Sequence, residues 1–389
     1  MHRIAVGLAL LAWSCAGASP APSPPPEPPV DEVTALMERW GLPGGQVAIA
    51  RDGRLRFSAA YGIADEGRPV TTQTRFRIAS LSKPITAVAV RLLIDEGRLS
   101  LDEPVLPHLA GAPADPRWDD ITVRHLLEHS GGFDRHESYD WTFESNRVAK
   151  ELDGARPPEL DAILRVVMRR PLSFDPGSHY AYSNLGYSIL GAVIEDVTGQ
   201  PYEAFVRDRV FAPAGIERME LGRTLPTDRP ADEARYFPHP EEAVARSVYP
   251  GGGEIATPDG GFYLPPMAAH GGWIACAEDL VRFLARVDGR PEPPDLVSSA
   301  ALDEMLAPPR HRDWDGLDIH YGHGFFVTQT EQGRAWLHDG SKPGTSAFMM
   351  RAEDGTVMVA LFNGRPVEGD VSRDIEDLMR VLAAQSAQE

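Results

Sequence analysis

The strand-like segments of this chain lie at its two ends, while the long middle has a mainly helical pattern. Near the start, residues 46–62 (QVAIARDGRLRFSAAYG) carry two apolar runs around Asp52-Gly53, a dipeptide typical of β-hairpin turns. Near the end, residues 334–340, 345–355 and 356–364 are further apolar runs bounded by turns, with Asp354-Gly355 as a second hairpin signal. The pattern predicts one antiparallel sheet assembled from both ends of the chain.

Helical patterns flank and interrupt this sheet. Apolar residues at helical spacing predict a helix over 30–40, stopped by Gly41 and Pro43, and a last helix over 370–384. Between them, further helical patterns occupy 84–97, 121–130, 185–199 and 276–287. We expect an α+β fold (an α/β sandwich): an antiparallel sheet with flanking terminal helices (about 31–84 and 284–389) and an inserted helical lobe (about 85–283). The active site should lie in the cleft between them.

The first 30 residues have the composition of a signal peptide and a linker, unlike the folded domain predicted after them. Residues 1–18 predict a secretory signal peptide, with His2 and Arg3 before an apolar run and a small-residue cleavage site at 16–18. Lipidation at Cys15 is the alternative, and the signal would then end before this cysteine. Residues 19–30 read as a proline-rich linker. We therefore expect an exported protein, periplasmic, in the cell envelope or extracellular, that meets a membrane only through a lipid anchor.

The charge and the cysteine content limit the kinds of partner that this protein can have. The net charge of −19 and the absence of basic clusters argue against binding nucleic acid. The only cysteines are Cys15 and Cys276, so ordinary cleavage of the signal leaves no pair for an internal disulfide. We expect a small-molecule or peptide substrate, no cofactor and no metal, while the oligomeric state stays open.

The segment 77–90 (RIASLSKPITAVAV) contains the only Ser-x-x-Lys in the chain, formed by Ser80 and Lys83. One helical turn places the two side chains on the same face, where the amine can activate the hydroxyl as a nucleophile. A lysine can lose its proton near neutral pH when buried, whereas arginine cannot. Pro84 disfavours the α conformation at Lys83, which predicts a 3₁₀-like turn from Ser80 to Lys83. The alternative is an N-cap serine beside a solvated lysine.

Two later segments supply candidate partners. Tyr182 and Asn184 lie two residues apart where a Pro-Gly loop meets a helical pattern, and could serve as proton carrier and substrate hydrogen-bonder. The alternative is a core tyrosine beside an ordinary helix cap. His338 and Gly340 lie on a predicted strand, where the glycine allows a close approach of another group.

In this order and spacing, the three segments resemble the serine β-lactamase and penicillin-binding protein superfamily. The similarity is greatest to its branch of class C β-lactamases, D-alanyl-D-alanine carboxypeptidases and esterases, and extends from Gln46 to near Leu382. The resemblance implies that Ser80 is the acylated nucleophile, Lys83 its base or proton partner and Tyr182 the proton shuttle. It further implies that Asn184 holds the acyl side chain of the substrate, and that the backbone amides of Ser80 and Ser341 form an oxyanion hole.

The third segment departs from the usual Lys-Thr-Gly of β-lactamases and reads His338-Asp339-Gly340. A histidine is mostly neutral at pH 7, so a fixed cation for a substrate carboxylate is missing from the motif. Asp339 should point to the opposite face of the strand and affect His338 only weakly. The direction of Lys342 stays open. We predict a preference for esters or neutral amides over penicillins and cephalosporins.

The sequence therefore predicts a serine hydrolase that forms an acyl-enzyme on Ser80, either an esterase or a D-amino-acid peptidase of the carboxypeptidase kind, and leaves weak β-lactamase activity open. One alternative is a degenerate penicillin-binding sensor or peptidoglycan-binding module. A further alternative is a zinc hydrolase, because His125, Glu128 and His129 match H-x-x-E-H on one helical face.

Overall fold

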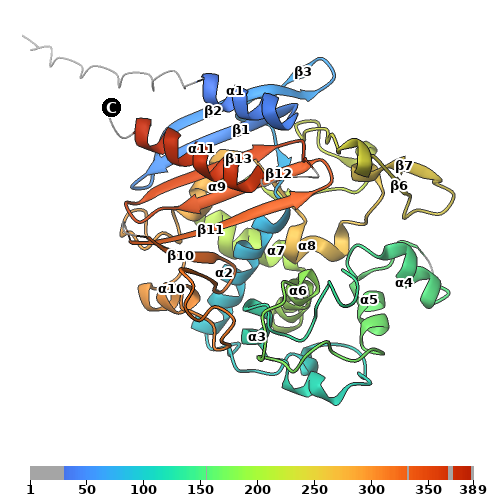
Figure 1. Ribbon diagram of the computed structural model, residues 1–389. Coiled ribbons are helices and arrows are strands. Elements are labelled where there is room, and N and C mark those ends of the chain that lie inside the picture. Colours follow the sequence, from blue (N-terminus) through green and yellow to red (C-terminus); the bar gives the residue numbers. More distant parts are fainter. Residues whose placement is uncertain (1–29, 155, 331–332, 367–370, 387–389) are drawn as a thin grey trace, which may run out of the picture.

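Both ends of the chain meet in one eight-stranded antiparallel sheet (Figure 1), which confirms the central prediction. The computed structural model describes residues 30–154, 156–330, 333–366 and 371–386. The expected signal peptide and nearly all of the linker lie outside these residues. The strand order is β3-β2-β1-β13-β12-β11-β10-β9. The strands are β1 Gly44–Arg51, β2 Arg54–Asp65, β3 Arg68–Pro69, β9 Ile319–Tyr321, β10 Phe326–Thr330, β11 Gly333–Lys342, β12 Thr345–Arg351 and β13 Thr356–Phe362.

The two predicted hairpins are present. Asp52 and Gly53 connect β1 to β2 with φ angles of 51° and 70°, the left-handed values that a tight hairpin turn requires. Asp354-Gly355 ends the longer connection between β12 and β13, in which Gly355 has a φ of 87°. The two hairpins join through the pairing of β1 with β13.

The terminal helices cover one face of the sheet (Figure 1), as expected. These are α1, Val30–Trp40, and α11, Val371–Ser386. Alternate strand residues point toward them and form an apolar layer, because side chains in a strand alternate between its two faces. Its fully or nearly fully buried members are Val33, Leu36, Val47, Ile49, Phe348, Met350, Met358, Ala360, Phe362, Ile375, Met379 and Leu382.

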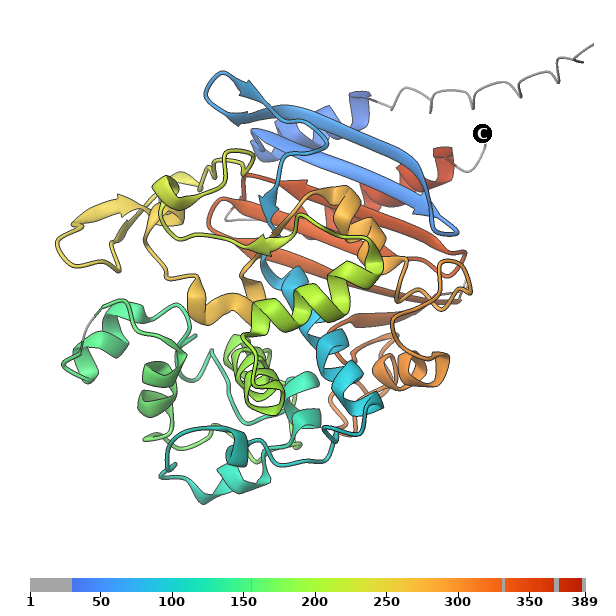
Figure 2. The same ribbon diagram turned by 180° about the vertical axis from the view of Figure 1, so that it is seen from behind.

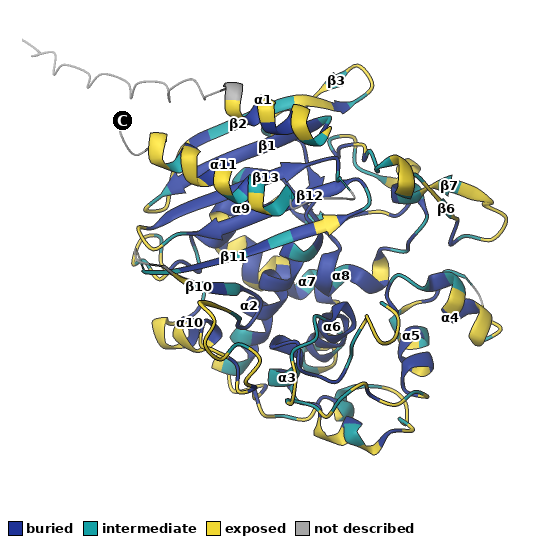
Figure 3. Ribbon diagram, viewed as in Figure 1, coloured by how far each residue is buried: buried dark blue, intermediate teal, exposed yellow. Residues whose placement is uncertain are grey.

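The helical lobe covers the opposite face, as the view from behind shows (Figure 2). The alternate strand residues on this side, including Ala48, Met349, Val359 and Leu361, join the large core that this lobe builds. Figure 3 shows that the strands and the central helices are buried throughout this interface. The helices are α2 Ser82–Asp95, α3 Val123–Leu127, α4 Ser145–Glu151, α5 Leu160–Val167, α6 Asn184–Thr198, α7 Tyr202–Val206, α8 Ala268–Gly271, α9 Ala277–Leu284 and α10 Ser299–Met305.

Short strands complete the fold. β4 (Phe76–Arg77), β8 (Trp273–Ala275) and β5 (Glu220–Leu221) form a small sheet, and β6 (Val244–Arg246) pairs with β7 (Glu254–Ala256). β4 leads into the 3₁₀ turn η1 (Ala79–Leu81), which lies against β11, β12 and α8. Helix α9 packs on β1 and β13, on the face opposite to α1 and α11. No helix in the described ranges combines the length and the apolar character needed to cross a lipid bilayer.

Candidate active site

Ser80 lies in the turn η1, immediately before α2 begins at Ser82. The 3₁₀ turn predicted at this point is present, although it starts at Ala79 and the α-helix already includes Lys83. Ala79 has a φ of 46°, a left-handed conformation that is unfavourable for a residue with a side chain. The turn presents Ser80 half-buried at the junction of the sheet and the helical lobe.

Lys83 is fully buried, and its amine contacts three oxygen atoms. Its Nζ lies 3.1 Å from Ser80 Oγ, 2.7 Å from Asn184 Oδ1 and 3.2 Å from the His270 carbonyl oxygen. Burial holds the pKa of Lys83 well below its usual value, and the charge of Lys342 acts in the same direction. A neutral amine has two N–H bonds and one lone pair. The two carbonyl oxygens can only accept hydrogen bonds, so the lone pair of Lys83 is left for the proton of Ser80.

Tyr182 precedes the N-cap of α6 and brings its phenol within hydrogen-bonding reach of Ser80. Its ring packs 4.3 Å from the ring of His129, and Lys83 Nζ lies 4.6 Å from its centroid. Burial raises the pKa of Tyr182 well above the ordinary value of a phenol, so it carries its proton at neutral pH. A neutral phenol beside the nucleophile can donate that proton to a leaving group.

Asn184 links Lys83 to a residue that the sequence analysis missed. Its Nδ2 donates to Asp140 Oδ2 at 2.6 Å, while its Oδ1 accepts from Lys83. Because a carboxylate can only accept, Asp140 fixes which end of the Asn184 amide faces the lysine. Thr142 Oγ1 in turn donates to Asp140 Oδ1 at 2.8 Å. Asp140 lies in an irregular loop, and only its proximity in the fold reveals it.

His338 is buried on β11, on the face toward the helical lobe. Its Nδ1 lies 2.6 Å from the Asp339 carbonyl oxygen and must donate to it, so Nε2 is free to accept from the Tyr321 hydroxyl at 3.2 Å. Burial lowers the pKa of His338 to about 4, so the imidazole is neutral at pH 7. The side chain of Asp339 faces the other side of the sheet and accepts from Ser372 of α11. The imidazole is thus neutral and Asp339 points to the opposite face, as expected, but the effect of Asp339 is not weak: its charge raises the pKa of His338 and is the largest influence after burial.

Gly340 and Ser341 lie where β11 runs past the nucleophile. A Cβ on Gly340 would meet the Ile78 carbonyl oxygen at 2.5 Å and the Ser80 nitrogen at 3.2 Å, so only glycine fits. On this side, pairing of β11 with β10 ends at Leu337, and the turn η1 takes the place of a neighbouring strand. The backbones of Ser80 and Ser341 thus belong to adjacent segments, as an oxyanion hole requires.

Lys342, whose direction was open, points into the interface of the two lobes. Its Nζ donates to the Gly271 carbonyl oxygen at 2.5 Å and lies 3.7 Å from Met267 Sδ. Burial lowers the pKa of Lys342 to about 7. Lys83 donates to the preceding carbonyl oxygen, that of His270. The two lysines therefore bind adjacent carbonyl oxygens at the end of α8.

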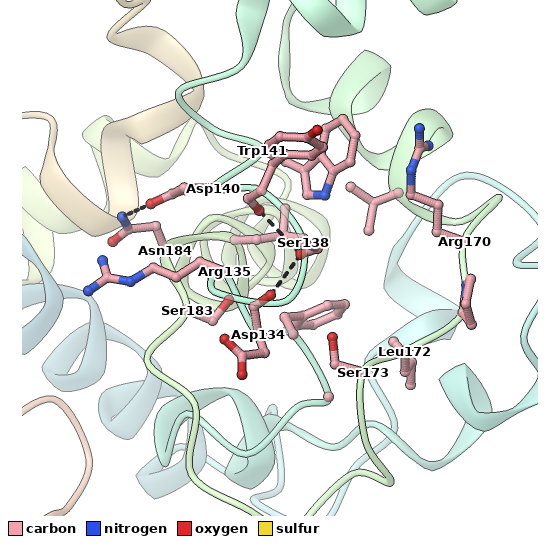
Figure 4. Close-up of a pocket in the computed structure, with 16 residues that line it drawn as sticks. Asp134, Arg135, Ser138, Asp140, Trp141, Arg170, Leu172, Ser173, Ser183 and Asn184 are labelled. Atoms are coloured by element: carbon pink, nitrogen blue, oxygen red, sulfur yellow. Dashed lines mark hydrogen bonds between the residues drawn. The ribbon is translucent and has the colours of Figure 1, made fainter.

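A shallow pocket adjoins Asn184 (Figure 4). Apolar side chains from the loop 132–141 and from α5 and α6 line much of it, among them Phe133, Trp141, Val167, Leu172 and Leu185. Arg135 extends from the rim beside Asn184, and its guanidinium lies 5.0 Å from the centre of the Tyr182 ring. The expectation that the site lacks a fixed cation was therefore incomplete: the third motif has none, but Arg135 supplies one.

The residues of the zinc alternative have other partners. His125 Nδ1 accepts from the backbone amide of Thr122, and His129 Nδ1 accepts from that of Ser183. Glu128 lies 3.5 Å from His323 Nε2. Among the residues that the structure describes, no group of three or more histidine, cysteine or acidic side chains is arranged to hold a metal ion. The zinc hydrolase hypothesis therefore has no support in this geometry.

The fold is that of the β-lactamases and penicillin-binding proteins. Residues 31–383 match the sequence model of the Beta-lactamase family, and the chain belongs to this family. Its homologues in this superfamily of serine hydrolases include penicillin-binding proteins, esterases and amidases.

Three known proteins illustrate the range of activities among these homologues. A penicillin-binding protein of Bacillus subtilis (strain 168) is 30% identical over 320 residues, which are 80% of this chain and 65% of that protein. Esterase EstB of Burkholderia gladioli is 40% identical over 189 residues, 47% of each chain. The chain thus spans less than two thirds of either relative. The structure of a D-amino acid amidase from Ochrobactrum anthropi SV3 superposes with a TM-score of 0.68 at 26% identity, covering 91% of this chain and 98% of the amidase.

Proposed function

We propose that this protein is a serine hydrolase that forms an acyl-enzyme on Ser80. The observation that carries the proposal is the environment of Lys83. Its two carbonyl acceptors, Asn184 Oδ1 and the His270 carbonyl oxygen, use the two N–H bonds of a neutral amine and direct its lone pair at Ser80 Oγ. A binding module that forms no covalent bond would gain nothing from a buried lysine whose pKa is lowered beside Ser80.

The chemistry follows from this geometry. Ser80 Oγ attacks the substrate carbonyl carbon while Lys83 takes the hydroxyl proton. The oxyanion formed faces the backbone of Ser80 and Ser341, where donors aimed at developing charge contribute about 3–4 kcal/mol. The bond between the carbonyl carbon and the leaving oxygen or nitrogen then breaks, and Tyr182 donates a proton to the departing alcohol or amine. Water then attacks the resulting ester of Ser80 and gives a proton to the Tyr182 phenolate. Lys83 returns its proton to Ser80 Oγ as the ester bond breaks, and the carboxylic acid is released.

The substrates that this site favours are esters and amides of small acids. The relatives named as an esterase and as a D-amino acid amidase support both classes. The neutral His338, already hydrogen-bonded through both nitrogens, offers no charge to the carboxylate of a β-lactam, and Arg135 is an exposed cation at the rim of the pocket, not one on β11. We therefore propose ester and D-amino-acid amide or peptide hydrolysis as the main activity, with β-lactam hydrolysis weaker.

A fluorophosphonate probe with intact-mass detection tests the proposal. We expect a single adduct on wild type, and neither adduct nor turnover of a short aryl ester in Ser80→Ala. Ser82→Ala is the matched control, because Ser82 lies in the same segment but faces the backbone amide of Trp273. A folded wild type without label or turnover would favour the binding-module alternative, and turnover by Ser80→Ala within tenfold of wild type would assign the nucleophile elsewhere.

A further inference from the structure

Asp140 is a half-buried carboxylate with neutral partners only. Its oxygens accept from Thr142 Oγ1 and Asn184 Nδ2, and no cationic side chain of the described residues lies within ion-pair distance of it. It lines the apolar pocket beside Asn184 (Figure 4). The charges of Lys83 and Lys342 act on this carboxylate from beyond ion-pair distance, so no described cation contacts it directly. Each of its oxygens retains capacity to accept a second hydrogen bond.

We propose that Asp140 binds the free α-ammonium group of an aminoacyl substrate, an inference that rests on the acyl-enzyme function proposed above. The site would thus take esters, amides or peptides of an amino acid whose own amine is unblocked. Its neighbouring apolar pocket, with Phe133, Trp141 and Leu185, would receive the side chain.

The position of Asp140 relative to the nucleophile fits this role. Only the Asn184 amide and Lys83 lie along the hydrogen-bonded path from Asp140 to Ser80 Oγ. The α-amine of an acyl group on Ser80 is two bonds away from the carbonyl carbon, so an acyl group that extends toward Asn184 carries its amine in the direction of Asp140. An ammonium provides three donors, which suit a carboxylate that has acceptor capacity left.

The charges around the site divide it into two sides. The Arg135 guanidinium lies 5.0 Å from the centre of the ring of Tyr182, the residue assigned to the leaving group. Asp140 lies in the pocket beside Asn184 and accepts from its amide (Figure 4). Arg135 and Asp140 do not form an ion pair with each other. An ammonium is therefore favoured on the acyl side and disfavoured beside Tyr182, which orients an aminoacyl substrate in the site.

The experiment compares two anilides that differ only in the amine, D-alanine p-nitroanilide and propionic acid p-nitroanilide. The readout is the ratio of their kcat/KM values in wild type, Asp140→Asn and Asp134→Asn. The loss of Asp140 could also alter the basicity of Lys83, but that effect changes kcat/KM for both anilides by the same factor and cancels in the ratio. Asp134→Asn is the matched control, because Asp134 lines the same pocket but its carboxylate accepts from the backbone amide of His136 and has no hydrogen bond to Asn184.

We expect Asp140→Asn to lower the ratio at least tenfold and Asp134→Asn to change it less than threefold. A parallel fall of both substrates in Asp140→Asn would overturn the inference and reduce Asp140 to a residue that positions Asn184. Failure of wild type to be labelled by the fluorophosphonate would instead overturn the proposed function itself.

A binding measurement covers the case in which Asp140→Asn does not fold. In Ser80→Ala, calorimetry compares D-alaninamide with propionamide, the corresponding pair without a reactive group. We expect D-alaninamide to bind at least tenfold more tightly. Equal affinities would contradict the role of Asp140.

Discussion

A lysine enclosed by carbonyl oxygens is the residue on which the chemistry of this site depends. Lys83 is fully buried among Ser80, Asn184 and His270, and burial favours its neutral form. The sequence located Lys83, Ser80 and Tyr182 because each belongs to a short motif with a chemical reason for its spacing. Asp140 and Arg135 belong to a loop without periodicity, and nothing in the sequence indicates that this loop folds over the site.

Lys83→Arg keeps a positive charge but removes the ability to accept a proton. We expect acylation by an aryl ester, followed as the pre-steady-state release of nitrophenol, to slow at least a hundredfold, the scale of general base catalysis. Lys150→Arg, at an exposed position in α4, serves as the control. Near-normal acylation by Lys83→Arg would show that only the charge matters.

His338 gives a prediction about pH. Because burial lowers its pKa to about 4, it stays neutral from pH 6 to pH 8. We expect the ratio of kcat/KM for an uncharged aryl ester to that for a cephalosporin to change less than threefold over this range. A ratio that rises several-fold from pH 6 to pH 8 would mean that a protonated His338 assists the carboxylate, contrary to its buried position.

At the scale of elements, the site depends on the close passage of β11 over η1. The sequence predicted the terminal helices, both hairpins and the 3₁₀ turn, because apolar periodicity and turn dipeptides are local signals. It could not predict that pairing of β11 with β10 stops at Leu337, which is what leaves room for the nucleophile turn. That detail depends on tertiary packing.

Gly340→Ala tests this contact. The added methyl group would lie 2.5 Å from the Ile78 carbonyl oxygen and 2.9 Å from Leu81 Cδ1, so η1 or β11 must shift. Overpacking of this kind costs about 1–3 kcal/mol, and we expect a lower melting temperature and at least a tenfold loss of kcat/KM. Gly154→Ala is the control, since the nearest atom to its added methyl group is 3.7 Å away. An active, stable Gly340→Ala would show that the segments separate easily.

At the scale of the whole molecule, Lys342 is one of the buried side chains that join the sheet to the helical lobe. Lys342 reaches from β11 to the Gly271 carbonyl oxygen in α8. Its pKa of about 7 in the folded protein lies below the value of about 10.4 for an unfolded chain. Between these values the unfolded chain binds the extra proton, so this group makes stability rise with pH from about 7 to about 10.

Lys342→Met removes this contribution. We expect the free energy of unfolding in urea to increase less between pH 7 and pH 9 in Lys342→Met than in wild type, although Lys83 retains an effect of the same sign. Urea unfolding followed by circular dichroism at pH 7 and pH 9 measures this free energy in both proteins. An identical increase in the two proteins would show that folding does not lower the pKa of Lys342.

The sheet that joins both ends of the chain also sets an order of events during synthesis. Ala48 of β1 pairs with Val359 of β13, about 300 residues later. At about 5–20 residues per second, the first hairpin waits on the order of 15 s or longer for its partner strand. During that time β1 presents an unpaired edge and the apolar side chains of Val47 and Ile49, the features that promote association between strands. The segment 44–65 is thus where a nascent chain most needs a chaperone.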